Sequence, residues 1–271
     1  MKDTESFVYL NVIHAIGRLA DMNRAELVPI LLNEYTGEQS CNRHRSAHER
    51  AVLSEALMMI IRRAGETAHL YVSDYIRACI KVFRRESKVL RDAEDKHNDC
   101  SENDELSTHH LLRQSSISLL AETCAMAGWS AGKLLPQVLD IAQGILQLEN
   151  PAISSAKHQK YRENLHCFDS KYGVHTSRRA AAYLIRYILN AIKQKLCIDL
   201  LYEVDEYLPK IRTILDTVSS YESRKILADG ELKDIFEDKV VLFHCRRALG
   251  VLDDIVPQLR AYKTKSGNQL L

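Results

Sequence analysis

The sequence predicts an all-α protein, built as an α-solenoid of about five helix pairs with two polar insertions. Turn-forming residues are scarce, with 10 Gly and 5 Pro in 271 residues, which favours long helices over many short strands. Five segments have the apolar spacing of amphipathic helices, and one proline-containing pattern recurs between them. We expect a single unit over residues 1–271, and the 46% of hydrophobic residues suffices for a core.

The first helix of each pair is indicated by apolar residues at spacings of i, i+3, i+4 and i+7. This spacing places one apolar stripe along a helix, and none of the five segments alternates as a strand would. The stripes are Tyr9, Ile13, Ile16 and Ala20; Leu53, Ala56, Leu57, Ile60 and Ala64; Ile117, Leu120, Ala121 and Cys124; Ala181, Leu184, Ile185, Ile188 and Ile192; and Val241, Cys245, Ala248, Leu249 and Leu252.

The second helix of each pair is indicated by a recurring pattern of two apolar residues, Pro, any residue and an apolar residue. It occurs around Pro29, Pro136, Pro209 and Pro257, which are four of the five prolines. Proline is tolerated in the first turn of a helix, where its missing N–H has no intrahelical partner, so each should start a helix. The second pair lacks this proline, and its second helix should span about residues 70–83.

Helix pairs of this kind cannot bury their apolar faces alone and therefore stack. The expected stack is of the HEAT or armadillo type, and the alternative is an irregular all-α bundle of the same helices. Two polar insertions would interrupt it: an acidic one over residues 87–108 and a basic one over residues 151–177. Both are expected to be mobile loops, although the basic segment, which continues to Arg179, could contact an acidic partner or RNA.

Catalytic and ligand-binding patterns are missing from the sequence: it has no GxGxxG, GxxxxGK[ST], GxSxG or HExxH. We therefore expect no enzyme, no cofactor and no catalytic residue. Cys41, His44 and His48 have the spacing of metal ligands but lack a fourth ligand. The group His97, Cys100, His109 and His110 falls in or beside the acidic insertion. Neither group is expected to bind a metal.

Charged groups on the expected helices have few partners that the sequence can place. Glu122 has none, and Asp253 with Asp254 is expected to be a surface acidic pair. The net charge of +1 gives no general attraction to nucleic acid or acidic membranes. Protein partners are therefore the first expectation and nucleic acid the alternative, with no small-molecule substrate.

The expected compartment follows from cysteine usage and hydropathy. The seven Cys are an odd number without a CxxC pair, which favours a reducing compartment. The first six residues are polar and acidic, unlike a signal peptide, and no run of about 18 apolar residues could span a bilayer. A cytoplasmic or nuclear location is expected.

Several segments resemble one known family in the same order along the chain. They are residues 5–21, 53–57, 62–66, 112–122 and 177–182. The sequence is similar to the C-terminal region of the Transport and Golgi organization protein 6 family, which includes the fungal RNA polymerase II assembly factor. The resemblance implies that the chain is the C-terminal part of a longer HEAT-like scaffold without catalytic residues. It implies a role in protein secretion and Golgi organisation, with peripheral association with Golgi membranes. The alternative that it implies is assembly and nuclear import of RNA polymerase II, with shuttling to the nucleus.

Overall fold

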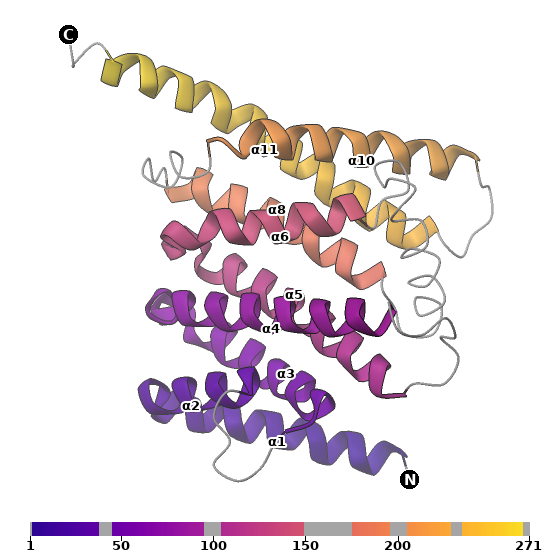
Figure 1. Cartoon of the computed structure of the whole chain (residues 1–271). Helices are drawn as coiled ribbons and strands as arrows, with labels where there is room; N and C mark the ends of the chain where they lie inside the picture. The colour runs from indigo at the N-terminus through magenta and orange to yellow at the C-terminus, as the bar shows by residue number, and fades with distance from the viewer. Residues whose placement is uncertain are drawn as a thin grey trace. The chain divides into compact units, whose positions relative to one another are not determined.

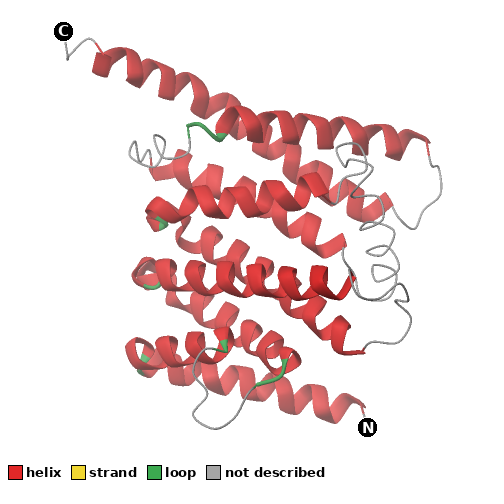
Figure 2. Ribbon diagram, viewed as in Figure 1, coloured by secondary structure: helices red, strands yellow, loops and turns green. Residues whose placement is uncertain are grey.

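The computed structural model describes residues 2–37, 45–94, 104–148, 175–195, 205–228 and 235–267. Within these ranges the secondary structure consists of helices joined by short turns, without a strand (Figure 2). The all-α fold class is therefore confirmed. Contacts between residues divide the chain into two compact units, residues 1–130 and residues 131–271. The exception is residues 170–172, which are assigned to unit 1 and lie outside the described residues. Each unit is described by itself below, and the expectation of one continuous solenoid stays a prediction.

The described residues of unit 1 form five α-helices and two short 3₁₀ helices. They are α1 (Lys2–Met22), α2 (Arg24–Thr36), α3 (Ala47–Ala64), η1 (Gly65–Leu70), α4 (Val72–Glu94), α5 (Asp104–Ala127) and η2 (Gly128–Ser130). The first helices of the expected pairs contact one another, since α1 packs on α3 and α3 on α5. The second helices α2 and α4 also pack together, so unit 1 has two rows of neighbouring helices (Figure 1).

Helices α1 and α3 approach closely and run in the same direction. A Cβ atom on Gly17 would lie 2.9 Å from the sulfur of Met59, so glycine permits this approach. One turn later on both helices, Asp21 pairs with Arg63. In both contacts the residue on α3 follows its partner on α1 by the same number of positions in the sequence, as it does when two helices run in parallel. Helices α1 and α3 are therefore parallel.

The apolar stripes expected in unit 1 form its core. Their buried members are Ile13, Ala20, Ala56, Leu57, Ile60, Ala64, Ile117, Leu120, Ala121 and Cys124. Leu53 and Ile16 are half-buried, and the side chain of Tyr9 lies outside the described residues. Fully burying one Leu or Ile side chain contributes about 1.5–3 kcal/mol to stability. The periodic pattern therefore identified the residues on which the packing of unit 1 depends.

In unit 2 the structure describes one 3₁₀ helix and four α-helices. They are η3 (Gly132–Leu134), α6 (Leu135–Leu148), α8 (His175–Lys195), α10 (Leu208–Ala228) and α11 (Ile235–Gly267). Helix α8 packs on α11 and α6 contacts α10, and Figure 1 shows α6 and α10 in front of α8 and α11. The expected stripes on α8 and α11 are buried, apart from the half-buried Leu249.

The recurring prolines have two different structural roles. Pro136 and Pro209 are each the second residue of their helix, as expected for first-turn prolines. Pro29, however, is the sixth residue of α2, and Pro257 lies inside the 33-residue helix α11. The fifth pair therefore has no separate second helix, contrary to the prediction. Ile255 and Leu259 on either side of Pro257 are buried, and their packing keeps the helix continuous despite the lost backbone hydrogen bond.

The acidic insertion expected over residues 87–108 is shorter than predicted. Helix α4 continues to Glu94, beyond the expected end at residue 83, and α5 begins at Asp104. Leu90 is buried, so the apolar face of α4 extends two turns further than the charge pattern indicated. Residues 95–103, and residues 151–174 of the basic insertion, lie outside the described residues, whereas residues 175–177 begin α8.

Candidate interaction surfaces

A buried polar network joins α3, α4 and α5 in unit 1. Glu86 on α4 is 1% exposed, and its carboxylate accepts hydrogen bonds from three side chains. Arg85 Nε donates at 2.9 Å, Arg50 Nη1 at 3.4 Å, and His109 Nδ1 lies 2.5 Å away. Burying a carboxylate costs several kcal/mol unless it is paired and hydrogen-bonded, and here it is both.

The same arginines cap the C-terminal end of α2. Arg50 Nε donates to the carbonyl of Tyr35 at 2.7 Å, and Arg85 Nη1 donates to the carbonyl of Thr36 at 2.6 Å. The next residue, Gly37, has a φ of 71°, the left-handed conformation that commonly ends helices. Cations at this end of a helix also interact favourably with its dipole. The network therefore positions the end of α2 against α3 and α4.

Three other buried ionisable groups of unit 1, Cys79, Cys124 and His110, are held in their neutral forms. Burial raises the pKa of the Cys124 thiol to about 12 and also raises that of Cys79. Burial, with the charge of Arg113, lowers the pKa of His110 to about 4. At neutral pH these groups are two protonated thiols and an uncharged imidazole, a state suited to packing rather than to nucleophilic chemistry.

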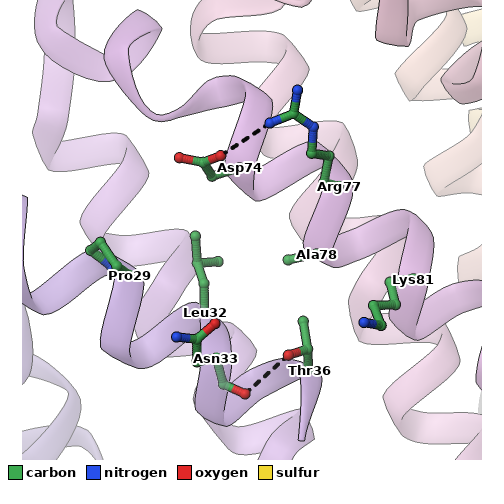
Figure 3. Close-up of a pocket in the computed structure, with 8 residues that line it drawn as sticks. All are labelled: Pro29, Leu32, Asn33, Thr36, Asp74, Arg77, Ala78 and Lys81. Carbon is green, nitrogen blue, oxygen red and sulfur yellow. Dashed lines mark hydrogen bonds and ion pairs between the residues drawn. The ribbon is translucent and has the colours of Figure 1, made fainter. Parts of the chain in front are cut away.

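A groove of about 320 Å³ lies between α2 and α4 (Figure 3). Each helix contributes four residues: Pro29, Leu32, Asn33 and Thr36 from α2, and Asp74, Arg77, Ala78 and Lys81 from α4. Leu32 and Ala78 are buried and form an apolar floor. Asn33, Arg77 and Lys81 are exposed at the rim. Arg77 and Asp74 form a 3.4 Å ion pair across one turn of α4.

A second groove, of about 290 Å³, lies between α10 and α11 in unit 2. It is lined by Leu208, Pro209 and Arg212 near the start of α10 and by Val256, Leu259 and Arg260 of α11, together with Asp205. Each groove thus contains one proline of the recurring pattern and lies beside a predicted second helix. A proline has a short side chain on the helix surface, which leaves room there. Both grooves combine an apolar floor with arginines at the rim.

Ion pairs join neighbouring helices of each unit in positions that the sequence could not place. Arg62 of α3 donates to both carboxylate oxygens of Glu122 on α5, at 2.6 and 3.0 Å. Asp253 and Asp254 are a surface pair, as expected, but they also bind Arg212 of α10 and Lys193 of α8, each at 2.5 Å. The sequence could place no partner for Glu122 and indicated only a surface pair for the two aspartates, because their partners lie 41 to 61 residues away.

The metal-ligand candidates are not brought together in the described part of the chain. His109 is bonded to Glu86, His110 is buried, and His48 lies exposed in the first turn of α3. Cys41, His44, His97 and Cys100 lie outside the described residues. A search of the described side chains found no group of three or more His, Cys, Asp or Glu suited to a metal ion. Among the described helices, none has the length and hydropathy needed to cross a bilayer.

Comparison with known proteins gives one match. Residues 1–67 match the family described as "Required for nuclear transport of RNA pol II C-terminus 1". The matched region contains α1, α2, α3 and the start of η1, and so includes one wall of the α2–α4 groove. No curated protein and no solved structure matches the chain. The match favours the polymerase-related alternative of the sequence analysis and gives no support to the Golgi-related role.

Proposed function

We propose that this chain is a non-enzymatic helical-repeat scaffold that binds proteins and acts in the nuclear transport of RNA polymerase II. The observation that carries the proposal is the match of residues 1–67 to a family described by that transport role. The scaffold would bind polymerase subunits or their carriers and would work in both cytoplasm and nucleus. We therefore propose the transport role in place of the secretory role that the sequence resemblance implied.

The packing of the helices supports the repeat architecture in the proposal. In unit 1 the first helices α1, α3 and α5 contact in series, and α2 packs on α4 in a second row. Interhelix ion pairs recur along the first row, from Asp21 to Arg63 and from Arg62 to Glu122. Stacked pairs of HEAT type present long rows of equivalent helices, which are suited to extended protein surfaces.

The α2–α4 groove is the proposed binding site for the partner. Its floor of Leu32 and Ala78 offers apolar contact, and Arg77 and Lys81 at the rim favour carboxylates of the partner. A groove of this size holds a few side chains rather than a whole helix. Partner side chains that are buried in such a groove and surrounded by polar residues usually contribute most of the binding energy of a protein interface.

Affinity purification of the tagged chain from its own cells, followed by mass spectrometry, tests the proposal. The Asn33→Trp variant would fill the groove from an exposed position on α2 without changing the core. Ile30→Trp is the matched control, because Ile30 is also exposed on α2 but does not line the groove. Thermal melts should show that both variants remain folded.

We expect the wild type and Ile30→Trp to recover RNA polymerase II subunits and Asn33→Trp to lose them. Recovery of secretory proteins without polymerase subunits would refute the transport role. Recovery of polymerase subunits by all three proteins would keep the role but exclude the α2–α4 groove as the site.

A further inference from the structure

One face of unit 2 carries a cluster of cationic side chains around an exposed aromatic ring. It is formed by Arg179 and Arg186 of α8 and by Lys239, Phe243 and Arg247 of α11, and is called here the α8–α11 cationic patch. Arg179 and Arg186 are seven residues apart, about two helical turns, and the α11 residues follow one another at intervals of four. Each set therefore lies along one side of its helix, and the two helices pack directly on each other.

Phe243 and the neighbouring Tyr187 hold two guanidinium groups of the patch in place. The Cζ atoms of Arg186 and Arg247 lie 5.2 Å and 5.6 Å from the centre of the Phe243 ring. Arg186 also lies 5.5 Å from the ring centre of Tyr187. Cation–π contacts at these distances are favourable and restrict the mobility of a long side chain. The two guanidinium groups are therefore ordered before any ligand arrives, although Phe243 is 48% exposed.

The positive charge of the patch is not neutralised within the described part of the chain. There, Arg179, Arg186 and Arg247 make no ion pair with a carboxylate, whereas Lys193 and Arg212 of the same unit bind Asp254 and Asp253. Burial, with the charges of Arg186 and Arg179, lowers the pKa of the neighbouring His244 to about 4. The imidazole is therefore neutral at pH 7, and its Nδ1 accepts a hydrogen bond from Arg186 Nη1 at 3.2 Å.

We propose that the α8–α11 cationic patch binds an acidic peptide segment of a partner protein. Arg186 and Arg247 each bind a carboxylate of the segment, and the exposed edge of Phe243 contacts an apolar residue between them. Guanidinium groups match carboxylates in shape and can bind them through two hydrogen bonds at once. The patch lies in unit 2, outside the matched residues 1–67, so this inference does not depend on the transport role.

Single-stranded nucleic acid fits the patch less well. Its binding proteins stack bases on open aromatic faces. Here the Phe243 ring is already contacted by two guanidinium groups, and Tyr187 is packed against Tyr183 with ring centres 4.1 Å apart. A ligand can therefore reach the edges of the guanidinium groups but not the faces of the rings. Guanidinium edges bind carboxylates better than they bind bases.

Fluorescence anisotropy with the full chain tests the proposal. The probe is a labelled peptide of about twelve residues, in which Asp and Glu alternate with single Leu and Phe residues. A peptide with Lys in place of every acidic residue and a single-stranded RNA of similar length are the comparison ligands. The variant is Arg186→Gln with Arg247→Gln, and Lys193→Gln is the matched control, since it removes a cation of α8 outside the patch.

We expect the acidic peptide to bind the wild type and Lys193→Gln alike, and the double variant at least roughly tenfold more weakly. Arg247→Gln alone, at an exposed position that leaves the core intact, should weaken binding by roughly fivefold. Binding should also weaken as salt rises, because the pairs are exposed. Equal binding by the double variant, tighter binding of the RNA, or no binding of the acidic peptide would overturn the proposal.

Discussion

Removal of the Glu86 charge should destabilise unit 1 far more than the same change at the surface. Glu86 is 1% exposed and accepts from Arg50, Arg85 and His109. Glu86→Gln keeps the shape of the side chain but leaves the Arg50 guanidinium, which is 8% exposed, without its counter-charge. Loss of one partner of a buried ion pair costs about 3–5 kcal/mol. Because Arg50 keeps its bonds to two α2 carbonyls, we expect the lower end, about 3 kcal/mol.

The matched control is Glu122→Gln. It also removes the charge of a glutamate on a helix that pairs with an arginine. Its partner Arg62 is 59% exposed, and surface pairs contribute only about 0–1 kcal/mol. Urea denaturation of the full chain, followed by circular dichroism, measures both free energies of unfolding. Hydrogen exchange of the α2 backbone amides provides a local measurement, because the network holds the end of that helix. A loss below about 1 kcal/mol for Glu86→Gln, or equal losses for the two variants, would refute the structural role of the network.

Three further predictions concern the core, pH and α11. Leu120→Asp should unfold unit 1, because Leu120 is 1% exposed and an unpaired carboxylate would be buried there, so a thermal melt like that of the wild type would place Leu120 outside the core. The wild type should lose stability as pH falls from about 6.5 towards 4, because the unfolded state then binds a proton at His110 that the folded state does not. His110→Gln should make this slope smaller by up to about 1.4 kcal/mol per pH unit, and unchanged slopes in urea titrations would contradict the assignment. Pro257→Ala should raise the melting temperature, since a proline inside a helix costs up to about 3 kcal/mol. An unchanged or lower melting temperature would contradict this prediction and would show that α11 is already adapted to the proline.

The candidate sites were less predictable from the sequence than the fold. The recurring proline pattern correctly placed the starts of α6 and α10, but Pro29 lies in the middle of α2 and Pro257 lies inside α11. Pro29 and Pro209 line the two grooves. The other walls come from Arg77 and Arg260, on helices that only packing brings beside those prolines. The cationic patch was likewise invisible, because Arg186 and Phe243 are 57 positions apart and neither belongs to a recognisable motif.

The sequence by itself determined the helices and their buried faces. Apolar spacing is a local property, so the stripes that contain Leu57, Leu120 and Ile188 could be assigned to the core without knowledge of their neighbours. Tertiary structure decided what the polar residues do and where some helices end. Helix α4 continues past residue 83 to Glu94 with Leu90 buried, and α11 continues through Pro257 between buried flanking residues. Glu86 is held by arginines from two helices. These outcomes depend on contacts between distant segments, and periodicity along one segment carries no information about them.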